Sequence, residues 1–330
     1  MPRDRSLSRG CVLCHQGAKM VLFVTGLCPR SCWYCPLSRE RKGKDVIYAN
    51  EKRIHTPEEA AGVARLMSAF GTGITGGEPL IVLDRVQQFS RHLKTEFGES
   101  HHIHLYTGIA PGREQLLDLQ GLVDEIRMHP PYETWDRILE SGYKEAACTA
   151  REMEFSVGIE VPSLPGIGSL EVMLPFLDFL NINELEWGET NAGAMRERRL
   201  VPEDGVHNAV SGARGWAKSL ISRQKVHWCS SRFKDSVQLR KRLLRVARNT
   251  ARPFDQITRD GTVLYGTLEN GGVVPPLFRQ LEPDMYEVRE GAIETAWWVI
   301  TEFSDQLAGE KSIVERYPDR GLVVEVTPVA

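Results

Sequence analysis

Three cysteines within eight residues, directly after an apolar run, constrain this chain more than any other feature of its sequence. Cys28, Cys32 and Cys35 form the pattern CxxxCxxC, and they follow the β-prone stretch Met20–Thr25. Thiolates at this spacing, on a loop that leaves a strand, can converge on one metal centre. The residues between them do not alternate as a buried strand would, which argues against free thiols packed in a core.

The number of thiolates limits which kind of metal centre these cysteines can hold. A complete iron–sulfur cluster usually takes four cysteine ligands, so three leave one iron without a protein ligand. An open iron is what a cluster needs if it must bind and reduce a small molecule. A zinc site with three cysteines and a remote fourth ligand is the nearest chemical alternative.

Composition excludes several other classes of protein. The chain has 330 residues, of which 42% are hydrophobic and 26% charged, and its formal net charge is −3. This balance suits a globular protein with a core and provides no global basic field for nonspecific nucleic-acid binding. No apolar run approaches the roughly 20 residues of a membrane span. The first ten residues are charged without a following apolar segment, so we expect no secretory signal and a cytoplasmic location, where clustered cysteines indicate metal ligation.

The first two-thirds of the chain alternate between β-prone runs and helical patterns. The clearest helix is predicted over Thr56–Phe70, where Thr56 caps, Pro57 fits the first helical position and Glu59 completes a capping box. This alternation predicts parallel βαβ units, in an open sheet or in a barrel. The β-prone runs are Met20–Thr25, Thr72–Thr75, His102–Thr107, Glu125–His129, Phe155–Val161 and Phe179–Leu185.

A second motif, Gly76-Gly77-Glu78-Pro79, follows the predicted strand Thr72–Thr75. Adjacent glycines expose backbone groups and allow a ligand to approach closely. Glu78 offers a carboxylate to a cationic group such as an ammonium. Without the cysteines upstream, the same residues would fit an ordinary tight turn with a solvated glutamate.

The two motifs together resemble those of the radical S-adenosylmethionine (SAM) enzymes. The signature of that family is CxxxCxxC with an aromatic residue before the last cysteine, a place that Tyr34 fills. The resemblance implies that Cys28, Cys32 and Cys35 hold a [4Fe–4S] cluster whose open iron binds SAM, and that Gly76–Pro79 contact the SAM amino group. It also implies that SAM is cleaved reductively to methionine and a 5′-deoxyadenosyl radical, which abstracts hydrogen from a substrate.

The resemblance further implies an α/β fold, a partial (β/α)6 TIM-like barrel, over about residues 20–190. The six β-prone runs agree with that barrel in number. Relatives often have Thr-Asn-Gly after the third strand, whereas this chain has Thr107-Gly108 and lacks the asparagine. The cysteine-rich segment, with LNINELE downstream, is similar to an uncharacterised archaeal group related to pyruvate formate-lyase activating enzymes.

Inward-facing strand positions provide candidates for catalysis. Side chains alternate along barrel strands and the outer faces should be apolar, so polar sets should face the interior. Active-site groups lie at the carboxyl ends of strands in related barrels, which favours His129, Glu160 and Glu186. These polar residues would hold SAM or a polar substrate, or would pair with one another as a buried polar layer. The polar sets are His102, His104 and Tyr106; Glu125, Arg127 and His129; Ser156 and Glu160; and either Asn181, Asn183 and Leu185 or Ile182, Glu184 and Glu186.

The alternation of predicted strands and helices ends near residue 230. We therefore predict an N-terminal CxxC segment over residues 1–19, the barrel over 20–230 and a small C-terminal α+β appendage over 231–330. In the appendage we predict a helix over Phe233–Ala251, a hairpin at Asp260-Gly261, a helix over Ala292–Gln306 and a strand over Gly321–Val326.

The first helix of the appendage is strongly basic over residues 232–252. Its cations would suit a phosphate backbone or a phosphorylated substrate, but a solvated face of an amphipathic helix is the favoured interpretation. No aromatic residues are interleaved as in single-strand binding, so RNA is not favoured as a partner. The cations are Arg232, Lys234, Arg240, Lys241, Arg242, Arg245, Arg248 and Arg252.

The remaining cysteines suggest a further metal site. Cys11 and Cys14 form a CxxC that needs more ligands, and Cys229 complements it best because it lies with His227 on a β-prone stretch. With His15, His227 or a substrate atom as fourth donor, these cysteines could hold an auxiliary iron–sulfur cluster, and zinc would suit the same donors. The alternative is two surface thiols in a flexible N-terminal segment.

The sequence therefore predicts a radical SAM enzyme with a [4Fe–4S] cluster and SAM as cofactors. We expect an electron donor such as ferredoxin or flavodoxin and an unidentified polar substrate, either a small metabolite or a modified tRNA base. Two alternatives stay open. A zinc-binding structural or interaction protein would not need the Gly76–Pro79 loop, and an iron–sulfur electron carrier would usually close its cluster with a fourth cysteine.

Overall fold

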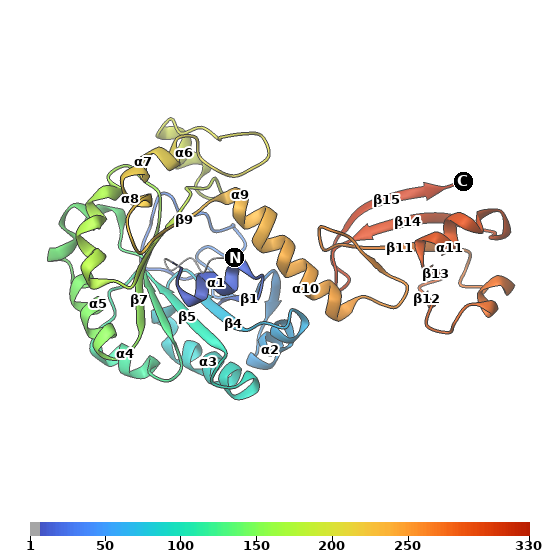
Figure 1. Cartoon of the computed structure of the whole chain (residues 1–330), viewed down its shortest axis with the longest axis horizontal. Coiled ribbons are helices and arrows are strands. Elements are labelled where there is room, and N and C mark those ends of the chain that lie inside the picture. Colours follow the sequence, from blue (N-terminus) through green and yellow to red (C-terminus); the bar gives the residue numbers. More distant parts are fainter. Residues whose placement is uncertain (1–6) are drawn as a thin grey trace. The chain divides into compact units, whose positions relative to one another are not determined.

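The computed structural model describes residues 7–330, which form two compact units (Figure 1). Of the predicted N-terminal segment 1–19, residues 1–6 lie outside the described residues. The predicted boundary near residue 230 lies a few residues before the division between the units. The first unit comprises the chain up to Arg65 and Ala69–Gln238, and the second comprises Leu66–Ser68 and Leu239–Ala330.

The first unit is built on a mostly parallel sheet of nine strands, in the order β3-β2-β1-β4-β5-β6-β7-β8-β9. Strands β1 and β4 to β9 run parallel to one another, and β2 and β3 form an antiparallel edge beside β1. The strands are β1 (Lys19–Phe23), β2 (Ile47–Ala49), β3 (Lys52–Ile54), β4 (Gly71–Thr75), β5 (His102–Thr107), β6 (Glu125–Met128), β7 (Ser156–Pro162), β8 (Phe179–Asn183) and β9 (Val226–Cys229).

From β1 to β9 the parallel strands are neighbours in the same order as in the sequence. Right-handed crossovers in one direction put all connecting helices on one face of a sheet, and Figure 1 shows α2 to α5 around the outside of this one. The two ends of the order, β3 and β9, do not pair with each other within residues 7–330. The helices are α2 (Pro57–Leu66), α3 (Leu83–Phe97), α4 (Arg113–Leu119), α5 (Gly142–Glu152), α6 (Ala192–Glu197), α7 (Ala213–Trp216) and α8 (Lys218–Ile221), with 3₁₀ segments η1 (Pro79–Val82), η2 (Tyr132–Glu140) and η3 (Ile167–Phe176).

All six predicted strands are confirmed, as β1 and β4 to β8, with ends that shift by at most two residues. The β-prone stretch around His227 is β9. Strands β2 and β3 were not predicted because each has only three residues, too few to show a period. The chain is therefore a mixed α/β protein with a parallel sheet.

The predicted capping box of α2 is also confirmed. The Glu59 amide donates to Thr56 Oγ1 (3.3 Å), and the Thr56 amide donates to the Glu59 carboxylate (3.1 Å). The helix ends at Leu66, earlier than the predicted Phe70, because Ser68 has a left-handed backbone with φ of 46° and the Ala69 amide closes on the Ala64 carbonyl.

The two faces of the parallel sheet differ in polarity, as predicted. One face is polar and includes His104, Arg127, Glu160 and Asn181. On β8 the inward set is Asn181 and Asn183, since both amides reach Glu160. The face that the helices cover is apolar and has no exposed surface at Ile103, Leu105, Ile126, Met128, Val157, Ile159, Leu180 and Ile182.

The second unit is an antiparallel sheet in the order β12-β13-β11-β14-β15, with β10 paired to β11. The predicted hairpin is confirmed, because Asp260-Gly261 lies between β10 and β11. The core of the second unit contains Leu268, Phe278 and Ile293. The elements are β10 (Gln256–Ile257), β11 (Val263–Glu269), β12 (Tyr286–Arg289), β13 (Ala292–Thr295), β14 (Glu310–Arg316), β15 (Val323–Val329), α11 (Trp297–Glu302), η5 (Pro276–Gln280) and η6 (Ser304–Gln306).

The helix predicted over Ala292–Gln306 is wrong in its first part. Ala292–Thr295 is strand β13, and helix begins only at Trp297. Glu290 and Gly291 both have positive φ, 51° and 84°, which makes a tight turn between β12 and β13 and returns the chain as a strand.

The basic helix predicted over Phe233–Ala251 is present as α9 (Ser231–Phe233), the π-helical segment η4 (Lys234–Leu239) and α10 (Arg240–Thr250). Several of its cations bind protein groups. Arg252 pairs with Asp255, Glu287 and Glu294, and Arg245 donates to the Met67 carbonyl oxygen. The sequence favours a solvated face, whereas the structure places Arg245 and Arg252 against protein groups. No helix in residues 7–330 has the length and apolar character needed to cross a membrane.

Candidate functional site

Cys28, Cys32 and Cys35 lie on the loop between β1 and β2, at the carboxyl end of β1. Cys28 is exposed and the other two are half-buried. Burial raises the pKa of Cys28, and the charges of Glu78, Cys32 and Cys35 add to that rise. A hydrogen bond from the Cys35 amide to the Cys32 carbonyl oxygen (3.2 Å) turns the chain between them. Three thiols on one loop fit a cluster with three protein ligands.

Two parts of the fold hold this cysteine loop. At its far end, Arg85 on α3 donates to the Asp45 carboxylate through both terminal nitrogens, at 2.6 and 3.0 Å. Near the cysteines, Asn191 Nδ2 donates to the Tyr34 carbonyl oxygen (3.1 Å). Thr190 Oγ1 donates to the Cys35 carbonyl oxygen (3.2 Å). The segment after β8 therefore supports the backbone that carries the thiols.

The Gly76–Pro79 turn lies directly beside the start of the cysteine loop. The Gly77 amide donates to the Thr25 carbonyl (2.6 Å), and the Glu78 amide donates to the Leu27 carbonyl (2.8 Å). A Cβ on Gly77 would lie 2.2 Å from the Leu27 carbonyl oxygen. The glycine is therefore required by the close approach of the chain's own backbone, an approach that sequence reasoning attributed to a ligand.

We expect Gly77→Ala to disturb this junction. The added methyl group would overlap the Leu27 carbonyl oxygen, so the turn or the loop must move, at a cost of about 1–3 kcal/mol in the free energy of unfolding. Gly62→Ala is a matched control, since no atom lies within 4 Å of a Cβ there and alanine favours helix α2. Chemical denaturation measures both variants, and a Gly77→Ala protein as stable as the wild type would contradict the tight contact.

Glu78 is buried, with 1% of its surface exposed. Its carboxylate accepts hydrogen bonds from the Leu80 amide (3.0 Å), Thr107 Oγ1 (2.8 Å) and the Gly108 amide (2.7 Å). Burial raises the pKa of Glu78, while these hydrogen bonds oppose the rise by favouring the ionised form. Glu78 thus joins the turn after β4 to the end of β5, and Thr107 has a partner that the sequence did not predict.

Arg30, between the first two cysteines, faces the same point as Glu78. Its Nη2 donates to the Tyr143 hydroxyl (3.2 Å), and that hydroxyl donates to the Gly108 carbonyl oxygen. Arg30 Nε is buried and has no hydrogen-bond partner within residues 7–330. A Cβ on Gly108 would lie 3.3 Å from Glu78 Oε2 and 3.4 Å from Arg30 Nε. A ligand with one ammonium and one carboxylate fits this pair of opposite charges.

Tyr34 and His129 contact each other at the carboxyl ends of the strands. The Tyr34 hydroxyl lies 3.2 Å from His129 Nε2, and His129 Nδ1 lies 2.9 Å from the Glu160 carbonyl oxygen. Because a carbonyl oxygen only accepts, Nδ1 carries a proton. Burial lowers the pKa of His129, so the ring is neutral and Nε2 accepts from Tyr34. The structure thus brings together one predicted catalytic residue and one predicted cofactor residue.

The carboxylate of Glu160 points into a buried polar layer. It accepts from Arg127 Nη1 (2.6 Å) and from the amides of Asn181 and Asn183 (both 2.9 Å). Burial would raise the pKa of Glu160, but the Arg127 charge and the two amides lower it to about 2. Arg127 also donates to Glu125 (2.6 Å). These side chains pair with one another as a buried polar layer, which is one of the two interpretations that the sequence left open.

Helix α1 (Arg9–His15) packs against this layer. Ser8 Oγ donates to Glu125 (3.1 Å) and accepts from Arg127 Nη2 (2.9 Å), while the Gly10 amide donates to Glu125 (3.2 Å). A Cβ on Gly10 would lie 2.5 Å from Arg127 Nη2. The predicted alternative of surface thiols in a flexible N-terminal segment is therefore wrong for residues 8–15, because they form a helix with buried polar contacts.

The other predicted site residues lie elsewhere on the first unit. Glu186 follows β8, and its carboxylate lies 2.9 Å from Lys234 Nζ at the start of η4. Cys11 and Cys14 lie on α1, Cys229 ends β9 and Cys148 lies on α5. Within residues 7–330, no three or more His, Cys, Asp or Glu side chains are already arranged as metal ligands.

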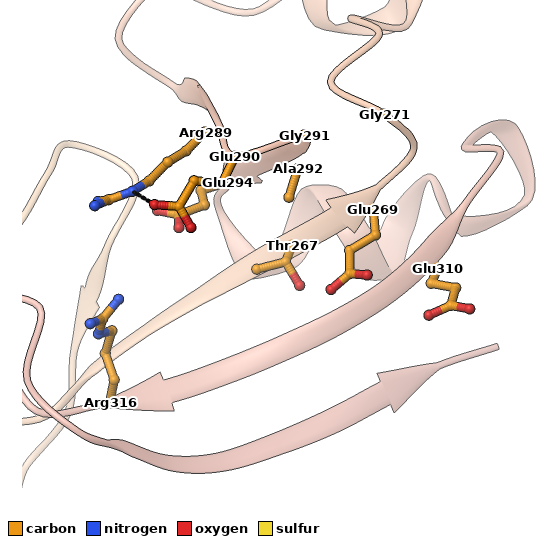
Figure 2. A pocket seen from close by; sticks show the side chains of 10 residues that line it. All are labelled: Thr267, Glu269, Gly271, Arg289, Glu290, Gly291, Ala292, Glu294, Glu310 and Arg316. Carbon is orange, nitrogen blue, oxygen red and sulfur yellow. Dashed lines mark ion pairs between the residues drawn. The ribbon is translucent and has the colours of Figure 1, made fainter.

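The second unit contains an open cavity of about 860 Å³ (Figure 2). Its lining is charged: Arg289 pairs with Glu290 (3.7 Å), and Glu294 pairs with Arg252. We assign it no part in the chemistry of the cysteines, which all lie in the first unit. The lining residues are Thr267, Glu269, Gly271, Arg289, Glu290, Gly291, Ala292, Glu294, Glu310 and Arg316.

Comparison with known proteins decides between the classes that the sequence left open. A model of 4Fe-4S single cluster domains matches residues 15–129, and a domain of unknown function (DUF8061) matches residues 261–329. A Methanocaldococcus jannaschii protein, provisionally named a glycyl-radical enzyme activating enzyme, is 40% identical over 281 residues, which are 79% of this chain and 73% of that protein. This chain belongs to the radical SAM enzyme family.

As a radical SAM enzyme, the protein uses a [4Fe–4S] cluster and SAM. The matched residues 15–129 include the three cysteines, the Gly76–Pro79 turn and His129. The cluster match and the family together rule out the zinc-binding structural protein and the simple electron carrier.

Solved structures of SuiB from Streptococcus suis are similar at a lower level. The structure bound to S-adenosylmethionine is 11% identical with a TM-score of 0.43, and the structure bound to precursor peptide SuiA is 12% identical with a TM-score of 0.41. Each match covers 64% of this chain. The chain spans about half the length of these proteins, 50% and 48%.

The geometry brings three further residues to the candidate site, and the sequence assigned none of them a role there. Arg30 lies within the cysteine motif, and a cation next to thiolates was the available signal. Thr107 ends the third predicted strand where relatives often have Thr-Asn-Gly, and the missing asparagine gave it no role in the sequence analysis. Asn191 carries no local signal, because its partner Tyr34 is 157 residues away in the sequence.

Proposed function

We propose that this enzyme holds the [4Fe–4S] cluster at Cys28, Cys32 and Cys35 and cleaves SAM reductively there. The observation that carries the proposal is the junction of the cysteine loop with the Gly76–Pro79 turn, where Glu78 and Arg30 face one point next to the thiols. When bound, the cluster supplies one electron that splits SAM into methionine and a 5′-deoxyadenosyl radical, which takes a hydrogen atom from the substrate.

Glu78 and Arg30 orient the amino-acid part of SAM in this proposal. The ammonium binds Glu78, and the carboxylate binds Arg30, whose Nε lacks a protein partner in the described residues. Three hydrogen bonds fix the Glu78 carboxylate, so little reorganisation is needed when the ligand arrives. Tyr34 and neutral His129 form a hydrogen-bonded pair without net charge beside the thiols.

We also propose that the parallel sheet forms the partial (β/α)6 barrel implied by the resemblance. Two observations support it. The strand order never reverses between β1 and β9, unlike that of a doubly wound open sheet. The polar side chains of β5 to β8 share the face opposite to the helices, as the interior of a barrel requires.

Exposure of Cys28 supports an external reductant, and we propose a low-potential protein such as ferredoxin or flavodoxin. For the substrate we propose a polar molecule, because His129, Glu186 and Lys234 lie where the parallel strands end. RNA is not favoured, since Lys234, Arg245 and Arg252 of the basic segment bind protein groups.

Anaerobic reconstitution with iron and sulfide tests the proposed reaction. The reconstituted full-length protein should be brown and should release 5′-deoxyadenosine from SAM only when dithionite is present. Metabolite and tRNA fractions, added separately, would reveal a substrate by raising that rate. A protein with a complete cluster that forms no 5′-deoxyadenosine under these conditions would contradict the proposal.

Glu78→Gln should weaken SAM binding about tenfold and leave the visible absorbance of the cluster unchanged. A hydrogen bond to a charged acceptor is stronger than its neutral counterpart by about 1–1.5 kcal/mol. Calorimetric titration of SAM into the anaerobic protein measures the dissociation constant. Glu133→Gln is the control, because Glu133 is an exposed carboxylate near Cys32. An unchanged affinity in Glu78→Gln would remove this role for Glu78.

A further inference from the structure

A second group of cysteines and histidines lies outside the proposed SAM site. On α1, Cys11, Cys14 and His15 are spaced by three and four residues, so they share one face of the helix. On β9, His227 and Cys229 are two residues apart and therefore point to the same side of the strand. The first unit thus carries two sets of soft metal donors on separate elements.

Contacts bring these two faces together. Asn181 Nδ2 donates to Cys11 Sγ (3.2 Å), and Asn181 is the direct neighbour of His227 in the register of β8 and β9. The His15 ring lies 5.4 Å from the His227 ring, centroid to centroid. Cys229 follows one step further along the same side of β9. The α1 face with the CxxC therefore packs over the β9 positions that carry a histidine and a cysteine.

We propose that Cys11, Cys14 and Cys229 hold a second metal centre through their thiolates, with His15 or His227 as the fourth donor. This centre is separate from the proposed cluster site at Cys28, Cys32 and Cys35. Its chemistry is thiolate ligation, which both zinc and an iron–sulfur cluster use.

Hydrogen-bond donors around the sulfurs support the assignment. Cys11 Sγ accepts from Asn181 and from Arg127 Nη2 (3.6 Å), and Cys229 Sγ accepts from Gln238 Nε2 (3.8 Å). A buried thiol that only fills space packs as a small apolar group. Donors directed at sulfur are instead typical of the surroundings of a metal-bound thiolate, where they orient the ligand and spread its charge.

Charge around the group points in the same direction. Arg127 Nη2 lies 3.6 Å from Cys11 Sγ and brings a positive charge to this sulfur. A positive charge at a sulfur offsets part of the negative charge that thiolates bring to a metal.

Binding requires the side chains to turn toward the metal. As they stand, no group of three or more donors in residues 7–330 is arranged as a ligand set, and that includes Cys28, Cys32 and Cys35. The second centre would join α1 to β9, two elements more than 200 residues apart in the sequence. Metal binding there should therefore stabilise the packing of α1 against the sheet.

The test uses the full-length Cys28→Ala/Cys32→Ala/Cys35→Ala variant, in which the proposed cluster ligands are removed. Iron, acid-labile sulfide and zinc are measured on protein purified without oxygen. We expect about one metal centre per chain, lowered at least about tenfold by a further Cys229→Ser and unchanged by a further Cys148→Ser. Zinc without sulfide identifies a zinc site, whereas iron with sulfide identifies a cluster.

If the Cys229→Ser variant does not fold, a second measurement tests the same site. Co²⁺ is titrated into the metal-free triple variant, where thiolate ligation gives a charge-transfer band that a further Cys14→Ser should remove. Cys14 is only half-buried, so this change disturbs the core less. A folded triple variant that is purified without metal and gives no cobalt band overturns the proposal. Metal content that neither Cys14→Ser nor Cys229→Ser changes overturns it as well.

Discussion

Replacing Cys32 with alanine should reduce 5′-deoxyadenosine formation to the level seen without protein. Loss of a side chain that only orients a metal ligand costs about 10- to 100-fold, so loss of one of three ligands should cost more than that. Cys32 is the middle thiol of the motif, and its carbonyl oxygen accepts the hydrogen bond that turns the loop toward Cys35. A backbone carbonyl is unaffected by the change, so the loop keeps its turn.

Cys148→Ala is the matched control for Cys32→Ala. Cys148 is half-buried on α5 and outside the CxxxCxxC motif, so its loss should leave iron content and SAM cleavage unchanged. Both variants are reconstituted side by side, and product is quantified by chromatography. A Cys32→Ala protein that cleaves SAM at the wild-type rate would refute the assignment of this motif as the cluster site.

Arg127→Met should destabilise the protein by about 3–5 kcal/mol, the largest stability effect that we expect from a single substitution. Arg127 is 1% exposed and lies between two buried carboxylates, Glu125 and Glu160. Removing the cation leaves both carboxylates buried without their ion-pair partner. Arg151→Met is the control, because its pair with Asp178 is largely solvated and should contribute at most about 1 kcal/mol. Chemical denaturation at equal metal loading measures both.

The pH dependence of the Arg127→Met deficit identifies its cause. In the wild type the pKa of Glu160 is about 2, so this carboxylate stays ionised over the whole working range. Without Arg127, the Asn181 and Asn183 amides and Lys19 still oppose the effect of burial, but the largest opposing charge is gone, so the pKa of Glu160 should rise from about 2. A carboxylate with a depressed pKa in the folded state contributes stability that is lost as the pH falls through that folded pKa. The deficit should therefore grow as the pH rises from about 2 through the raised pKa of the variant and then level off, whereas a constant deficit would point to packing alone.

Local patterns were sufficient to predict the parts of this protein that depend on neighbouring residues. The cysteine triplet and the Gly76–Pro79 turn are short motifs, and each of the six predicted strands is a short β-prone run. Alternation of polar and apolar residues also predicted which side chains of β5 to β8 would share a face. These features follow from spacing along one segment, which a single sequence records directly.

The supporting contacts could not be predicted, because they join segments far apart in the chain. Arg30 and Tyr143 are separated by 113 residues, and Asn191 and Tyr34 by 157. Nothing in either segment indicates its partner, since the pairing exists only after the strands are in order. The error at Ala292–Gln306 has a similar origin: a helical pattern was overridden by the turn at Glu290-Gly291 and by ladder bonds to β11 and β12.

The position of α1 has a consequence for how the chain folds. Ser8 and Cys11 are synthesised early, yet their partners Glu125 and Asn181 follow 117 and 170 residues later. A helix of seven residues is not stable in isolation, so α1 cannot form before those partners exist. Its docking is therefore a late step, delayed by closure of a long loop and completed after translation has passed β8. The charged side chains of Glu125 and Arg127, which α1 covers, stay hydrated until that step. In unfolding, the departure of this short segment exposes them to water first.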